Sequence, residues 1–101
     1  MHETAEETRA LFTERIPDLR KKFGIRKIGI FGSVAQGKAS EESDVDVLVE
    51  FEEGQASFDH FMELIQYLED LLGKRVDLVT TRGLSPYLRP SIEQEVIWCE
   101  G

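Results

Sequence analysis

Two aspartates separated by one residue, Asp44 and Asp46, lie in the valine-rich run DVDVLVEF. Successive side chains of a β-strand point to opposite faces, so these aspartates share one face while the valines can be buried on the other. Two ionised carboxylates placed this way repel each other unless a cation lies between them. Mg²⁺ suits such a pair, because proteins usually hold it with one or two carboxylates, waters and substrate phosphates.

Two further features fit the same chemistry. Asp77 lies in a second apolar run, RVDLVT. On a neighbouring strand it would complete a site for two Mg²⁺ ions about 3.5–4 Å apart, which activate a hydroxyl and neutralise a leaving pyrophosphate. Upstream, Gly32 and Ser33 form a turn after the run IRKIGIF. Glycine lets the backbone approach a triphosphate, and a serine hydroxyl with nearby N–H groups can hold its oxygens.

Other interpretations of the same residues remain open at this point. Residues 32–38 match the start of a P-loop, G-x-x-x-x-G-K, but Ala39 stands where a Ser or Thr would bind Mg²⁺, and no helical periodicity follows. The two close aspartates lie in an acidic run and can be a solvated strand face. Asp77 alone can be a surface acid paired with a basic neighbour. The turn and the three aspartates in this order favour a site.

The spacing of apolar residues predicts two helices that would support this site. Residues 4–23 and 58–72 follow a helical period, and Gly24 and Gly73 are suited to end them. Pro17 lies inside the first of these segments. We expect it to break the helix or to open a second one, because proline lacks the N–H that a helix interior requires.

Strands are predicted at residues 25–31, 44–51 and 75–80, where β-branched residues are enriched. Pro90 is expected to open a final helix. The apolar residues assigned to that helix are Ile92, Val96 and Ile97. The order of elements predicts an α/β (α+β) fold, with a small mixed three-stranded sheet flanked by helices.

Composition bounds the function. With 101 residues, 41% hydrophobic and 32% charged, the chain is predicted to be one small globular domain. A formal net charge of -8 argues against direct nucleic-acid binding. The lone cysteine, Cys99, excludes an intrachain disulfide. The start of the chain is polar and no apolar run could cross a membrane, so we expect a cytoplasmic protein that does not bind membranes.

The run GSVAQGKASEESDVDVLVEF resembles the signature of the polymerase-β-like nucleotidyltransferases: a Gly-Ser turn, a spacer, then Asp-x-Asp on a strand. With the later RVDLV and LRPSIEQEV, the chain is similar to the minimal nucleotidyltransferases (MNT) in particular, over residues 24–96. These are the small partners of HEPN-domain proteins in prokaryotic toxin–antitoxin pairs. The resemblance implies the polymerase-β-like palm fold and a single MNT domain over residues 1–101.

The resemblance also implies a role for each residue of the motif. The catalytic and metal-binding residues would be Asp44, Asp46 and Asp77. The nucleotide-binding residues would be Gly32, Ser33 and Lys38. The family usually reads Gly-Ser-x-Ala-Arg-Gly, and Gln36 replaces that arginine here, which removes a positive charge near the triphosphate. Lys38 would compensate for part of that loss.

The function implied is Mg²⁺-dependent transfer of AMP from ATP to a hydroxyl, normally of a tyrosine, on a HEPN-type toxin that is thereby silenced. Two alternatives remain: a non-catalytic antitoxin that masks its toxin by contact, and a small-molecule nucleotidyltransferase. The chain is too short to include a domain that grips an acceptor. We therefore expect a protein partner to supply the acceptor, or the chain to form a homo-oligomer, and the acidic surface suits a basic partner protein.

Overall fold

The computed structural model describes residues 4–38 and 43–100, and in these residues four strands form one mixed sheet in the order β3-β2-β1-β4. β1 (Ile25–Phe31) pairs antiparallel with β2 (Val45–Phe51) and with β4 (Ile97–Cys99). β2 pairs parallel with β3 (Val76–Thr80). The α/β class and the mixed sheet are confirmed, and the first three strands begin within one residue of the predicted positions.

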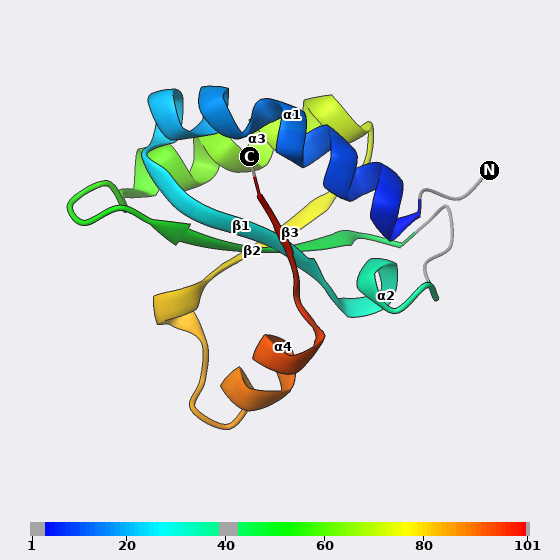
Figure 1. Cartoon of the computed structure of the whole chain (residues 1–101). Coiled ribbons are helices and arrows are strands. Elements are labelled where there is room, and N and C mark those ends of the chain that lie inside the picture. Colours follow the sequence, from blue (N-terminus) through cyan, green and yellow to red (C-terminus); the bar gives the residue numbers. More distant parts are fainter. Residues whose placement is uncertain (1–3, 39–42, 101) are drawn as a thin grey trace.

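Two long helices cover one face of the sheet (Figure 1), α1 (Ala5–Phe23) and α3 (Phe58–Leu72). Both begin at a hydroxyl N-cap, Thr4 for α1 and Ser57 for α3, which accepts a backbone N–H of the first turn. Both end at the predicted glycine in the left-handed conformation. The local sequence signals therefore set the ends of both helices.

The break predicted at Pro17 is wrong, because α1 runs through it as one helix. Apolar residues of α1 on both sides of the proline are buried in the core. They are Phe12, Ile16, Leu19 and Phe23. Packing along this single face holds the two halves in line, and it outweighs the one hydrogen bond that proline cannot donate.

The core lies between the sheet and these two helices. Val45, Val47 and Val49 of β2 belong to it, together with residues of α1 and α3. The alternation of the strand then places Asp46 and Glu50 on the opposite face, as predicted. None of the described helices combines the length and the apolar character needed to cross a membrane.

Short elements lie away from the two long helices. α2 (Gly32–Ala35) follows β1 directly, and η1 (Thr81–Gly83) follows β3. α4 (Arg89–Glu95) begins with Pro90 in its first turn, as predicted. Figure 1 shows η1 and α4 on the side of the sheet opposite to α1 and α3.

The prediction of a three-stranded sheet needs correction, because the final helix ends at Glu95 and the chain continues as β4 beside β1. The apolar residues of 96–99 alternate rather than follow a helical period. Cys99 is buried in the core, while Trp98 lies opposite Gly29 and faces the other side. Three strand residues are too few for this alternation to be recognised in the sequence.

Candidate active site

Asp46 of β2 and Asp77 of β3 lie directly opposite each other in the parallel ladder. Paired strands are about 4.8 Å apart, so the two carboxylates are neighbours on the face away from α1 and α3. Asp46 is half-buried and Asp77 is exposed. The apolar residues on either side of Asp46 fix this orientation, because Val45 and Val47 are fully buried in the core.

The pKa of the Asp46 carboxyl is raised from 3.8 to about 6. Burial is the largest cause, since it disfavours the charged form. The negative charges of neighbouring carboxylates add to it, and so does the hydrogen bond that a protonated Asp46 can donate to Asp77. These carboxylates are, in decreasing order of effect, Asp77, Asp44 and Glu95. Asp46 therefore lies in an excess of negative charge that a cation would relieve.

Asp44 precedes β2 by one residue and is exposed. Its charge acts on Asp46, so the structure brings Asp44, Asp46 and Asp77 together at one end of β2 and β3. In the part of the chain that the structure describes, no three His, Cys, Asp or Glu side chains form a ready-made metal cage. Mg²⁺ does not need one, because it keeps several waters and takes oxygens from substrate phosphates. The donor set thus fits Mg²⁺ shared with a nucleotide.

The turn after β1 approaches these carboxylates closely. Phe31 pairs with Asp46 in the sheet, so Gly32 follows directly beside it. Gly32 has φ +71°, and a Cβ atom at this position would overlap a carboxylate oxygen of Asp46. Only glycine combines that conformation with this approach. The close backbone approach expected of Gly32 is therefore present in the structure.

Ser33 and Lys38 belong to the same turn. Ser33 is half-buried in α2, and its carbonyl oxygen accepts the Lys38 N–H at 2.8 Å. The Lys38 side chain is exposed. The P-loop interpretation is wrong, because α2 is four residues long and no long helix follows the glycine turn. Ala39, on which part of that interpretation depended, lies outside the described residues.

Glu95 also belongs to the site, although no spacing or periodicity in the sequence assigns it there. The Gly32 N–H donates to Glu95 Oε1 at 3.0 Å, and Gln36 Nε2 donates to Glu95 Oε2 at 2.9 Å. Glu95 is the last residue of α4 and is half-buried. Glu95 reaches the turn because η1 and α4 cross the face of the sheet opposite to α1 and α3 (Figure 1). The spacing of residues in the sequence does not predict this crossing.

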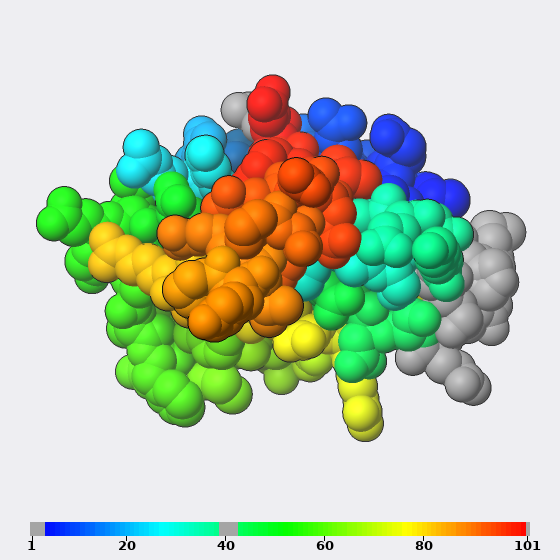
Figure 2. All heavy atoms as spheres, turned by 90° about the horizontal axis from the view of Figure 1, so that it is seen from below, coloured from blue at the N-terminus to red at the C-terminus, as the bar shows by residue number. Residues whose placement is uncertain are grey.

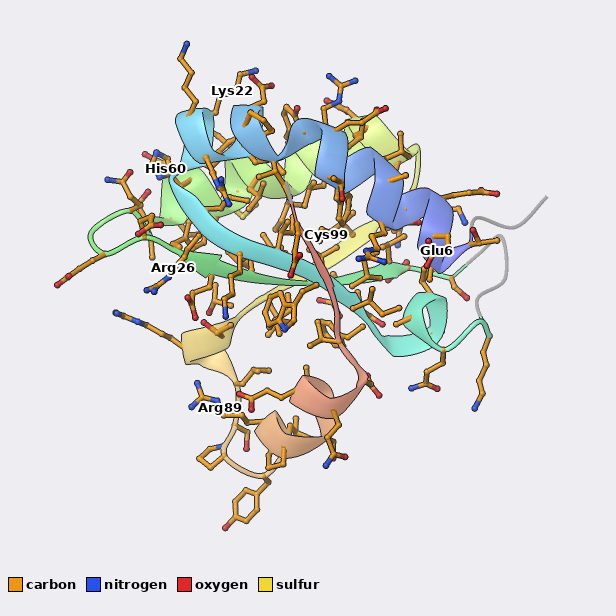
Figure 3. The ribbon with its side chains drawn as sticks, in the orientation of Figure 1. Glu6, Lys22, Arg26, His60, Arg89 and Cys99 are labelled. Atoms are coloured by element: carbon orange, nitrogen blue, oxygen red, sulfur yellow. The ribbon has the colours of Figure 1, made fainter. Side chains whose placement is uncertain are left out.

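A cleft of about 780 Å³ lies on the same face of the sheet, between the sheet and the segment formed by η1 and α4. Leu48, Glu50 and Trp98 contribute to its floor. In Figure 3, Arg26 extends from the sheet and Arg89 from the segment at α4, on the same side of the molecule, and both line the cleft. Figure 2 shows that the α4 segment covers the middle of this face.

The chemistry of the cleft is mixed rather than apolar. Arg26 pairs with Glu50 at 3.5 Å, and the Lys27 ammonium lies 5.4 Å from the centroid of the Trp98 ring. Leu48 and Asp46 are two residues apart on the same face of β2, so the cleft begins about 7 Å along the strand from Asp46. A cleft of this size and position can hold a nucleoside or an acceptor side chain beside the aspartates.

Paired aspartates on an open sheet face, next to a glycine turn, fit an enzyme that acts on the phosphates of a nucleotide with the help of metal ions. Comparisons with known proteins agree. A model of the nucleotidyltransferase domain matches residues 14–99. The protein adenylyltransferase MntA of Thermococcus cleftensis is 46% identical over 95 residues, which cover 94% of this chain and 95% of that protein. The chain therefore belongs to the nucleotidyltransferase family, within its protein adenylyltransferases.

Solved structures place it more narrowly. A minimal nucleotidyltransferase superimposes with a TM-score of 0.79 at 44% identity, covering 95% of this chain and 96% of the other. A toxin–antitoxin crystal structure with AMP-PNP gives a TM-score of 0.71 at 27% identity, covering 88% of this chain and 73% of the other. The resemblance to the minimal nucleotidyltransferases, drawn from the sequence, is confirmed, as are the palm fold and the enzyme class.

Proposed function

We propose that this protein transfers AMP from ATP to a tyrosine hydroxyl of a HEPN-type toxin and so acts as its antitoxin. The observation that carries the proposal is the opposition of Asp46 and Asp77 beside the Gly32 turn. The adenylyltransferase relative supports the activity, and the toxin–antitoxin complex with AMP-PNP supports the nucleotide and the kind of partner.

Each residue of the site has a role in this reaction. Gly32, Ser33 and Lys38 bind the phosphates through backbone N–H groups, a hydroxyl and an ammonium. Asp44, Asp46 and Asp77 would hold the Mg²⁺ ions. When bound, Mg²⁺ neutralises the leaving pyrophosphate and lowers the pKa of the attacking hydroxyl.

The step is an in-line displacement at the α-phosphorus. The tyrosine oxygen forms a bond to the α-phosphorus, and the bond from that phosphorus to the bridging α–β oxygen breaks, so pyrophosphate leaves. Asp77 is exposed and lies beside Asp46, so it can face an incoming hydroxyl and accept its proton. The partner supplies the acceptor across the open face, where the cleft leaves access.

The wider setting follows from the substrate. A reaction that consumes ATP fits the cytoplasm, which the sequence also favours. The net charge of -8 fits a basic protein surface better than a phosphate backbone. The proposal also includes a homo-oligomer, in which copies of this chain would contact each other through a surface separate from the one that meets the toxin.

A purely masking antitoxin is the second candidate, and one observation favours it. Gln36 stands where relatives of this kind carry arginine, and its amide donates to Glu95. This turn therefore carries one cation fewer to attract the triphosphate, and Lys38 compensates for only part of that loss.

Transfer of label separates the two candidates. The protein is incubated with Mg²⁺, its genomic HEPN-type neighbour and ATP labelled either at the α- or at the γ-phosphorus. AMP transfer labels the partner from α-labelled ATP alone. Label from neither ATP, while the partner is still neutralised, would favour masking, and label from γ-labelled ATP would indicate a kinase instead.

A further inference from the structure

Glu95 occupies the turn that the proposed function assigns to the nucleotide. Its two carboxylate oxygens accept from two different donors, the Gly32 N–H at 3.0 Å and the Gln36 side-chain amide at 2.9 Å. A carboxylate that accepts from two donors of a turn makes the same contacts as two oxygens of a phosphate. We propose that Glu95 is a built-in competitor of the nucleotide phosphates, displaced from the turn when ATP binds; this rests on the proposed function.

Displacement follows from the number of donors and from charge. The Gly32 N–H is a single donor, so it cannot bond fully to Glu95 and to a phosphate oxygen at once. Glu95 already lies close enough to Asp46 for its charge to act on that carboxyl. A triphosphate at the same turn would add several negative charges beside Glu95. The two anions therefore exclude each other.

Only the side chain of Glu95 needs to leave the turn. The backbone beyond it is held in the sheet, because β4 follows after one residue and its Ile97 pairs with Ile30 of β1. The Glu95 side chain is half-buried, and it contacts the turn through its hydrogen bonds with Gly32 and Gln36. A change of side-chain rotamer breaks both bonds without disturbing the sheet.

A purely positioning role for Glu95 predicts the opposite effect on affinity. If Glu95 holds the turn in the shape that ATP needs, its loss weakens nucleotide binding. If Glu95 competes, its loss strengthens binding. Glu95→Gln separates the two roles, because glutamine keeps the shape and one acceptor oxygen and removes the charge that makes the bond to Gly32 strong.

The test is calorimetric titration of the full chain with AMP-PNP and Mg²⁺. Glu95→Gln should bind about fivefold more tightly than the wild type, the size expected for losing one competing hydrogen bond. Glu63→Gln is the matched control, since it removes the same charge from an exposed position of α3, which covers the other face of the sheet. Its affinity should equal that of the wild type.

Three outcomes would contradict these proposals, and they separate the competitor role of Glu95 from the proposed function. Equal or weaker binding by Glu95→Gln, with the wild type binding normally, overturns the competitor and leaves the proposed function standing. Equal gains in both variants show a general charge effect and also overturn the competitor. No binding of AMP-PNP by the wild type and by Glu95→Gln overturns the proposed function itself. Thermal unfolding of both variants confirms that each is folded.

Discussion

Gly32 lies so close to Asp46 that a Cβ atom on residue 32 would overlap a carboxylate oxygen of Asp46. Gly32→Ala should therefore disturb the site in two ways, through its φ of +71° and through this collision. Gly37 offers a matched control, because its φ is +73° and a Cβ there meets nothing within 4 Å.

The two alanine variants should differ clearly. Gly37→Ala should cost about 1 kcal/mol of unfolding free energy, and Gly32→Ala about 2 kcal/mol more. Gly32→Ala should also lose AMP-PNP binding, which Gly37→Ala should largely keep. Chemical denaturation and calorimetry measure both effects. Equal costs in the two variants would contradict the close approach of the turn to Asp46.

Asp46 should make the metal-free protein less stable as the pH rises. Its folded pKa of about 6 lies above the unfolded value of 3.8, so the folded state binds the proton more tightly. Stability should fall as the pH rises from about 4 through 6. Asp46→Asn removes this dependence, and above pH 7 it should be more stable than the wild type by about 1 kcal/mol, allowing for solvent screening of a half-buried group.

Thermal unfolding of the wild type and of Asp46→Asn in a chelating buffer, from pH 3 to pH 8, measures this difference. The two proteins should converge toward pH 3, below both pKa values, where the wild-type carboxyl is mostly protonated in the folded and the unfolded state. A constant difference over the whole range would mean that the variant acts through packing rather than charge.

Ser33→Ala should lower turnover more than it weakens binding. If the Ser33 hydroxyl holds a phosphate oxygen whose charge grows during transfer, the bond is strongest in the transition state. A loss of about tenfold or more in kcat, with a change in the AMP-PNP dissociation constant of less than threefold, is expected. A loss confined to affinity would place the hydroxyl on the ground-state nucleotide instead.

Trp98 should report on the acceptor. It is half-buried, lines the cleft and has the Lys27 ammonium 5.4 Å from its ring centroid. Binding of a tryptophan-free variant of the HEPN-type partner should therefore shift Trp98 emission. Trp98→Phe is the control for signal from other sources. Emission that stays constant while a complex forms would show that the partner does not reach the cleft.

Local signals in the sequence were enough to predict the long elements. Helical spacing and terminal glycines gave α1 and α3, and strand alternation put Asp44 and Asp46 on one face. Asp77 is predicted to belong to the same site, because a carboxylate between the apolar residues of a strand is unusual unless it has a function. Each of these predictions depends on residues that are close in the sequence or on one repeated pattern.

Tertiary contacts decided the rest. The helix continues through Pro17 because the core holds both halves, and β4 is too short to show a period. Ile97, assigned from the sequence to a final helix, instead begins β4, and the next residue, Trp98, lies in the floor of the cleft. Glu95 reaches the site only because the chain returns over the open face of the sheet.

Transfer of AMP, with Asp77 acting on the acceptor hydroxyl, can be detected in the intact mass of the partner after incubation with ATP and Mg²⁺. Wild type should add the mass of AMP to the partner. Asp77→Asn should bind AMP-PNP but add no AMP, and it should fail to rescue growth of cells that express the toxin. No added AMP with the wild-type protein, together with full rescue by Asp77→Asn, would contradict the account and leave a masking antitoxin.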